Sequence, residues 1–276
     1  MATISRLQKI IIKNIAYHNR YRLIIHKSKQ LLTYKSKHKN IIKKMTKSIF
    51  IKLIKNIIIL NPHITNNNIN NLINNSTFNN DGYVQDLCLN SLSLKELPEN
   101  CWLYEINGNV NLSNNKLKLL PCGFEKLKIG GSLNCSCNGM LSLNSNFGNI
   151  TIGGSIDLSN NFFSNLPETF TNLKVRGDLN LSQNKLKNSA LLLIPQFIIK
   201  SLYINNNTEI TVIPANFYNM VIGGNLEVFG CPIIELPFNF IKIYIGKKLL
   251  HNNQYIQKYI DLYSSNCEDN IFESNF

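Results

Sequence analysis

The sequence predicts an α/β solenoid of tandem repeats, with one parallel strand in each copy. Three observations support this: a repeat period of about 23 residues, alternating apolar and polar residues at the start of each copy, and recurrent Asn, Pro and Phe further on. The intervals between the starts of successive copies are 23, 23, 23, 23, 23, 24 and 23. Each copy begins with an apolar residue, here called position 1: Leu87, Val110, Leu133, Ile156, Leu179, Leu202, Leu226 and Leu249.

Positions 1 and 3 are both apolar and are separated by a polar residue, as in Leu179 and Leu181. This period of two is typical of a strand with one buried face. Proline at position 12 bars further sheet pairing and is expected to end the strand side of the copy. Phenylalanine at position 15 predicts a column of rings in one continuous core; the residues are Phe124, Phe147, Phe170, Phe217 and Phe240.

Position 6 is asparagine in five successive copies. A buried amide is costly unless it forms hydrogen bonds, so these side chains are expected to bond the backbone of neighbouring turns. Leu92 and Cys231 occupy position 6 in the first and seventh copies, where we expect the ladder to weaken. The predicted structural ladder consists of Asn115, Asn138, Asn161, Asn184 and Asn207.

The segment from Val110 to Pro121 resembles the leucine-rich repeat, whose core is Leu-x-Leu-x-x-Asn/Cys-x-Leu. The resemblance covers about residues 84–255 and implies a solenoid that binds other proteins. The Ile-Gly-Gly-Ser phrase at 129–132, with the Asn, Ile and Lys bias, is similar to leucine-rich repeat proteins of giant amoeba-infecting DNA viruses. In this sequence Ile129 precedes Leu133 by four places instead of three, which predicts a kink or bulge before each strand.

We therefore expect four segments. Residues 1–63 are basic, rich in Ile and Lys, and predicted to be helical; residues 64–83 form an Asn-rich N-terminal cap, in which Ile69, Leu72 and Ile73 share one helix face. Residues 84–254 hold seven to eight repeats with a mostly non-helical outer face, because a copy this short leaves no room for a long crossover helix. Residues 255–276 are expected to form a C-terminal cap or tail, with Ile256, Ile260 and Leu262 at helical spacing.

Charge divides the chain unevenly. Residues 1–80 contain 15 Lys or Arg and no acidic residue, whereas residues 81–276 contain 14 basic and 16 acidic residues. An amphipathic helix is predicted from about Asn40 to Leu60. Three interpretations remain open: a cap whose Lys content reflects AT-rich codons, contact with nucleic acid or an anionic membrane through residues 1–60, and a mitochondrial presequence. The candidate polyanion contacts are Lys35, Lys37, Lys39, Lys43, Lys44 and Lys47.

Positions 2, 4 and 5 of the copies are expected to form a concave surface, called the strand face below. Most of its residues are small and polar, but aromatic and acidic residues gather toward its C-terminal end. Aromatic rings beside a carboxylate favour a protein-binding hot spot over a nucleic-acid track. The alternative is that these polar residues only solvate the sheet. The candidate partner-binding residues are Tyr203, Glu227, Phe229, Asp157 and Asn180.

The sequence predicts no catalytic residue, cofactor, metal ligand or small-molecule substrate, because no catalytic or phosphate-binding motif is present. Cys135 and Cys137 should face opposite sides of a strand, and an odd total of seven cysteines favours a reducing compartment. We find no secretory signal or membrane-length apolar run, so an intracellular protein is expected, in the host cytoplasm if the chain is viral.

The leading hypothesis is a non-enzymatic module that binds another protein, whose identity the sequence does not reveal. The first alternative is a polyanion-associating protein that acts through residues 1–60. The second is a ubiquitin-ligase adaptor, a function that would require an appended catalytic or F-box-like domain.

Overall fold

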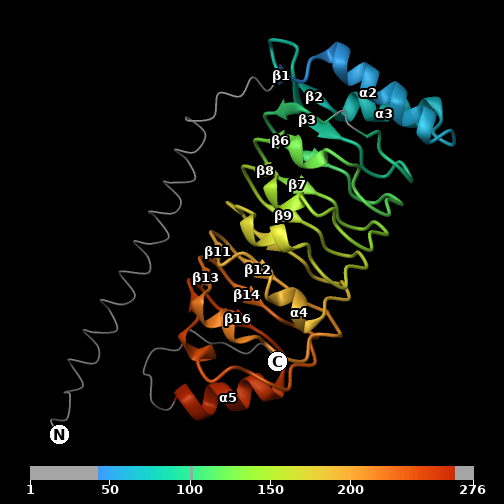
Figure 1. The fold of residues 1–276 in the computed structure, drawn as a ribbon. Coiled ribbons are helices and arrows are strands. Elements are labelled where there is room, and N and C mark those ends of the chain that lie inside the picture. Colours follow the sequence, from blue (N-terminus) through green and yellow to red (C-terminus); the bar gives the residue numbers. More distant parts are fainter. Residues whose placement is uncertain (1–42, 100–101, 265–276) are drawn as a thin grey trace, which may run out of the picture. The chain divides into compact units, whose positions relative to one another are not determined.

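The computed structural model describes residues 43–99 and 102–264. Its contacts divide the chain into residues 1–40 and residues 41–276, and all of the described residues belong to the second unit. In this unit the copies stack in sequence order, with α2 and α3 at one end and α5 at the other (Figure 1). The lysines Lys35, Lys37 and Lys39 lie outside the described residues.

The principal sheet has nine strands in the order β16-β14-β12-β10-β9-β7-β5-β3-β2. Eight of them are parallel, and position 1 of each copy pairs in register with position 1 of the next, as Leu133 does with Ile156. Only β2 is antiparallel to its neighbour. The strands are β2 Thr77–Phe78, β3 Val84–Cys88, β5 Val110–Asn111, β7 Leu133–Asn134, β9 Ile156–Asp157, β10 Leu179–Asn180, β12 Leu202–Tyr203, β14 Leu226–Glu227 and β16 Leu249–Leu250.

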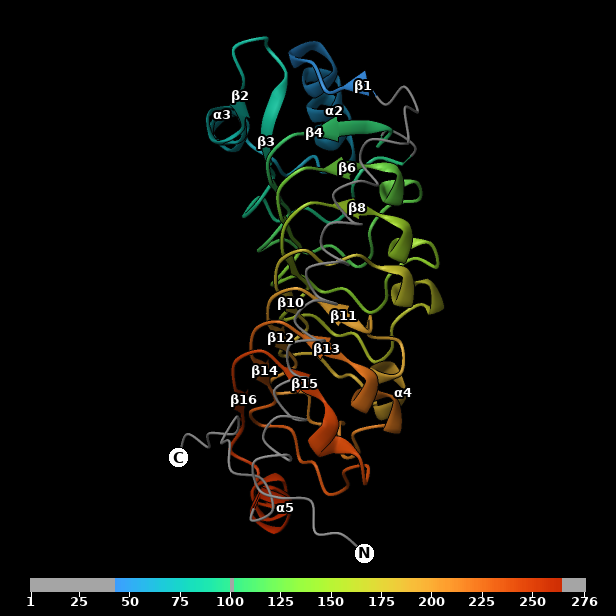
Figure 2. The ribbon, with the colours of Figure 1, turned by 90° about the vertical axis from the view of Figure 1, so that its left-hand side faces the viewer.

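Most copies contain a second short strand, which the sequence analysis did not anticipate. These strands form the sheets β1-β4-β6-β8 and β11-β13-β15 on another side of the solenoid (Figure 2). Of the kink or bulge expected before each principal strand, the structure shows a kink: the chain turns a corner at Gly130 and Gly131, which connect β6 to β7. The strands are β1 Lys43–Lys44, β4 Tyr104–Ile106, β6 Lys128–Ile129, β8 Thr151–Ile152, β11 Phe197–Ile198, β13 Val221–Ile222 and β15 Tyr244–Ile245.

The outer side is mostly non-helical, as predicted, with short 3₁₀ turns after the position-12 residue. All five position-15 phenylalanines are buried, and the rings of Phe147 and Phe170 stack with centroids 6.2 Å apart. Trp102, which the sequence analysis missed, extends the column, because its ring lies 5.0 Å from that of Phe124. The outer turns are η1 Phe124–Lys126, η2 Phe147–Asn149, η3 Glu168–Asn172, α4 Asn188–Leu191, η4 Ala215–Asn219 and η5 Phe240–Lys242.

Two helices cover the N-terminal end of the repeats, α2 Lys47–Leu60 and α3 Asn66–Asn75. The predicted helix over residues 40–60 was too long, because Thr46 caps its first turn and Lys43–Lys44 pair with β4. Residues Phe50, Leu53, Ile54 and Ile57 of α2 join the core of the repeats, so no break in this core occurs at residue 63. In α3, Leu72 is buried, Ile69 is half-buried and Ile73 is 40% exposed.

Asn61 joins α2 to the first copy. Its side chain is fully buried, and its Nδ2 donates to the carbonyl oxygens of Ile57 and Glu96, both at 2.9 Å. Its Oδ1 accepts from the N–H of Lys95 at 2.8 Å. Asn61 therefore bonds backbone groups of both α2 and the first copy, as the position-6 asparagines are predicted to do between neighbouring copies.

The C-terminal end is covered by α5 Gln254–Ser264, in which Ile256 and Ile260 are buried whereas Leu262 is 66% exposed. Asn253 begins this helix, since its Oδ1 accepts from the N–H groups of Tyr255 and Ile256. His251 occupies the buried position 3 of the last copy and is 1% exposed. Its Nδ1 accepts from the N–H of Asn253 at 3.3 Å, and its buried Nε2 has no partner among the described residues.

The stability of the protein should fall as the pH drops below about 6.5, the ordinary pKa of histidine. Burial lowers the pKa of His251, because the charged imidazolium loses its hydration in the core. Between pH 7 and 5 the unfolded chain then binds more protons at this site, so unfolding becomes easier by at most about 1.4 kcal/mol per pH unit. Chemical denaturation of the full-length protein across this range measures the slope.

Two variants isolate the contribution of His251. His251→Leu should flatten the slope, since leucine and isoleucine fill position 3 in most other copies. His63→Gln is the matched control, a histidine replacement at an exposed position of the opposite cap. A slope that persists in His251→Leu would assign the pH dependence to other groups.

Candidate binding surfaces

The five position-6 asparagines bond backbone groups of their own and the preceding copy. Asn161, for example, is 3% exposed; its Nδ2 donates to the carbonyl oxygens of Cys135, Leu158 and Ser159, each at 3.1 Å. Its Oδ1 accepts from the N–H of Met140 at 3.2 Å. The same pattern is formed by Asn115, Asn138, Asn184 and Asn207. In the seventh copy the thiol of Cys231 donates to the carbonyl of Ile204 at 3.1 Å.

A second polar column, which the sequence analysis missed, precedes position 1. Each side chain in it accepts a hydrogen bond from the backbone N–H of the equivalent residue in the next copy, as Asn109 does from Ser132 at 2.8 Å. The seven bonds measure between 2.7 Å and 3.3 Å. The sequence pattern that predicts this column is a short polar residue every 23 or 24 positions. The column comprises Asp86, Asn109, Ser132, Ser155, Asp178, Ser201, Asn225 and Lys248, which ends it as a donor only.

The architecture follows from the parallel strands, which stack in register, and from the asparagine side chains that join the turns of five successive copies. The fold is a leucine-rich repeat solenoid. The eight parallel strands pair in sequence order. The position-2 residues of all copies therefore form one row on the strand face. A binding surface on this face is therefore built from residues one repeat apart in the sequence.

The strand face brings four of the five candidate residues together. Asp157, Asn180, Tyr203 and Glu227 are consecutive partners across β9, β10, β12 and β14. Neighbouring strands lie about 4.8 Å apart, so the four side chains form one row. Phe229 is the position-4 residue of the copy that holds Glu227, and all five side chains are half-buried.

Asn205 fixes the C-terminal end of this row. Its Nδ2 donates to Oε2 of Glu227 at 3.1 Å, and its Oδ1 accepts from the N–H of Phe229 at 2.8 Å. Asn205 occupies position 4 of the copy that holds Tyr203, and it bonds to both residues of the next copy. The Glu227 carboxylate and the Phe229 backbone are thus held in place in the absence of a partner.

In the middle of the row the Oδ1 atoms of the position-2 side chains are already engaged. Oδ1 of Asp157 accepts from both the N–H and the hydroxyl of Ser159, at 2.9 Å and 2.6 Å. Oδ1 of Asn180 accepts from the N–H of Ser182 at 3.1 Å. The same position-2 to position-4 bonds occur in the two preceding copies. Asp157 and Asn180 therefore act first as structural acceptors within their own strands.

Two of the described lysines of the N-terminal segment lie against aromatic rings. The Nζ of Lys44 is 5.3 Å from the ring centroid of Tyr83, and that of Lys47 is 5.7 Å from that of Phe78. Such contacts stabilise a cation above a ring face. Lys43 and Lys44 form β1, at the edge of the second sheet.

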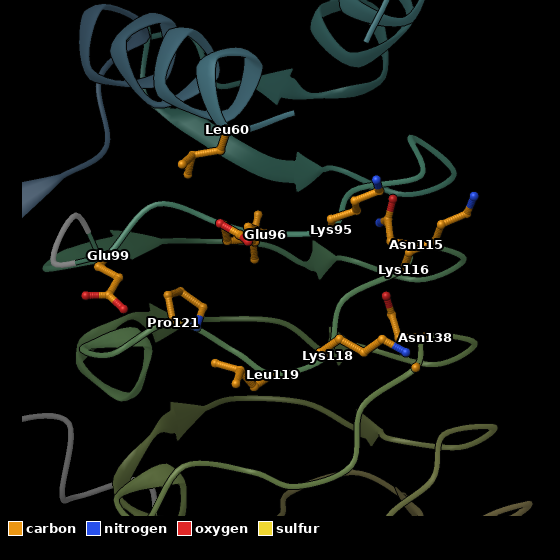
Figure 3. Close-up of a pocket in the computed structure, with 12 residues that line it drawn as sticks. Leu60, Lys95, Glu96, Glu99, Asn115, Lys116, Lys118, Leu119, Pro121 and Asn138 are labelled. Carbon is orange, nitrogen blue, oxygen red and sulfur yellow. The ribbon is translucent and has the colours of Figure 1, made fainter. Parts of the chain in front are cut away.

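A groove of about 880 Å³, called the cap groove, lies between the end of α2 and the loops of the first three copies (Figure 3). Leu60 and Leu119 lie on its two sides and are 39% and 56% exposed. Three lysines gather at one end, and Glu99 lies at the other. Its lining comprises Leu60, Lys95, Glu96, Leu97, Glu99, Asn115, Lys116, Lys118, Leu119, Pro121, Asn138 and Gly139.

The described part of the chain offers no group of three His, Cys, Asp or Glu side chains that could hold a metal ion. Cys135 is fully buried and burial raises the pKa of its thiol, whereas Cys137 is half-buried. None of the described helices combines the length and apolar character needed to cross a membrane.

Comparison with known proteins gives a match among solved structures. No protein-family model matches the sequence, and no curated protein matches it. Among solved structures, the one described as "Structure of Shigella effector LRR domain" is similar to this chain, with 17% sequence identity and a TM-score of 0.45. The match covers 89% of this chain and 94% of the Shigella chain.

Proposed function

We propose that this protein is a non-enzymatic module that binds another protein through the C-terminal end of its strand face. The contact would centre on Tyr203, Glu227 and Phe229. The observation that carries the proposal is that Glu227, whose carboxylate accepts a hydrogen bond of 3.1 Å from Asn205, pairs across the sheet with Tyr203 and shares its copy with Phe229. Aromatic residues dominate hot spots at protein interfaces.

Pre-organisation supports the same conclusion. A side chain that is already held loses little conformational freedom on binding, so more of the contact energy appears as affinity. Elsewhere on the strand face the polar side chains bond one another, as Asp157 does with Ser159. Such pairs offer a partner fewer unsatisfied groups. The five described cysteines are free, which fits a partner inside a reducing compartment.

Truncating both rings should remove the partner. We expect the double variant Tyr203→Ala/Phe229→Ala to lose at least about 2 kcal/mol of affinity, the usual cost of deleting hot-spot residues. Affinity capture with the full-length protein, followed by quantitative mass spectrometry, should show proteins that are retained by the wild type and lost by the double variant. Titration with the purified partner then gives the loss of affinity.

The matched control is Phe162→Ala. Phe162 is an aromatic residue that is 47% exposed, but it occupies position 7 and lies outside the strand face. This variant should keep every partner. Partners retained equally by all three proteins, with unchanged thermal melting, would contradict the proposed site.

A further inference from the structure

We propose that the cap groove is a second binding site, which takes a segment of a partner protein that carries carboxylates beside one or two apolar side chains. The groove lies at the N-terminal end of the repeats, and none of its lining residues belongs to the row that contains Tyr203. The inference therefore goes beyond the function proposed above. Three features of the groove support it.

The first feature is apolar surface on two opposed sides. Leu119 is 56% exposed although its neighbour Leu120 is completely buried, and Leu60 is 39% exposed at the end of α2. Between them lie the buried Leu97 and Pro121. Removing such surface from water is favourable in proportion to its area. The volume of about 880 Å³ falls within the range of about 300–1,000 Å³ that is typical of ligand sites.

The second feature is a cluster of like charges at one end. Lys95, Lys116 and Lys118 are all exposed, and among the described residues none forms an ion pair with a carboxylate. Gly139 leaves space for Lys118, since a Cβ on this glycine would lie 3.2 Å from the lysine Nζ. Three neighbouring ammonium groups attract a carboxylate and raise the rate at which it associates.

The third feature is the opposite charge at the other end. Glu99 lies there, and Glu96 lies between it and the lysines (Figure 3). A segment that is acidic along its whole length would meet both glutamates, as would the evenly spaced phosphates of a nucleic acid. The groove therefore favours a peptide with its carboxylates at one end and apolar residues next to them, bound in one direction.

Selection from a phage-displayed library of random dodecapeptides on the immobilised full-length protein tests the proposal. The enriched peptides should combine Asp or Glu with adjacent apolar residues. When the best of them is titrated by fluorescence anisotropy, Leu119→Asp and Lys118→Glu should each weaken binding at least about tenfold. Two matched controls should bind as the wild type does: Leu192→Asp, at a leucine that is 51% exposed, and Lys187→Glu, at the same repeat position as Lys118.

Several outcomes would overturn the proposal. Enrichment of neutral or basic peptides, or of none whose binding responds to Leu119→Asp, would show that the groove is not this kind of site. Carbodiimide coupling of Glu96 or Glu99 to a lysine of residues 1–40 would make the chain's own basic segment the occupant. If the wild type sediments as a dimer and Leu119→Asp as a monomer, the occupant of the groove is a second copy of the chain. Tyr203→Ala should leave peptide binding intact, so failure here is distinct from failure of the strand-face proposal.

Discussion

Replacing Asn161 with alanine should lower the free energy of unfolding by about 1–3 kcal/mol. The substitution removes Nδ2, whose two hydrogens are shared among three carbonyl oxygens, and Oδ1, which accepts from the N–H of Met140. It leaves the N–H of Met140 without a partner in a buried turn, whereas the three carbonyls each keep one other donor. An unpaired buried N–H costs about 1–3 kcal/mol. Chemical denaturation of the full-length variant measures the loss.

Two further substitutions show whether the loss comes from the hydrogen bonds. Asn161→Cys should cost less than Asn161→Ala, because Cys231 donates from this same position to a buried carbonyl. Asn160→Gly should change stability little, since Asn160 is exposed and has a φ of 55°, a left-handed backbone that suits glycine. Equal stability of wild type and Asn161→Ala would mean that the ladder does not stabilise the fold.

The fold was predictable because one pattern is repeated eight times. The constant repeat period, with apolar positions 1 and 3, placed every principal parallel strand. The two smaller sheets were missed because their strands lie outside the position-1 to position-3 pattern from which the principal strands were predicted. The column before position 1 was missed because Asp, Asn and Ser share no obvious class, although each offers the same acceptor.

The binding surfaces were predictable only in part. The row containing Tyr203 and Glu227 follows from the repeat register, because both residues occupy position 2. The engagement of Asp157 by Ser159 required the side-chain geometry. The cap groove could not be predicted from the repeats, because Leu60 belongs to a helix outside them and faces Leu119 across the groove only when α2 is docked on the first copy.

The glycine corners should tolerate no side chain, and Gly153→Ala is expected to cost about 3 kcal/mol or more. A Cβ on Gly153 would overlap the carbonyl oxygen of Gly130 in the preceding copy. The obstacle is backbone, which cannot rotate away as a side chain does. Relief requires separating the two copies, and that would break the hydrogen bond of 2.8 Å from the Gly153 N–H to the carbonyl of Ile129.

Gly82→Ala separates this clash from the general cost of replacing glycine. Gly82 has a φ of 76°, and a Cβ there would meet nothing within 4 Å. Its replacement should therefore cost only about 1–2 kcal/mol, the strain of a left-handed alanine. Thermal and denaturant unfolding of both variants should show the larger loss of stability for Gly153→Ala. The backbone of Gly153 is one that any residue could adopt if there were space for its side chain. A larger loss at Gly82 would mean that the corners separate easily and that close stacking of the copies does not require glycine.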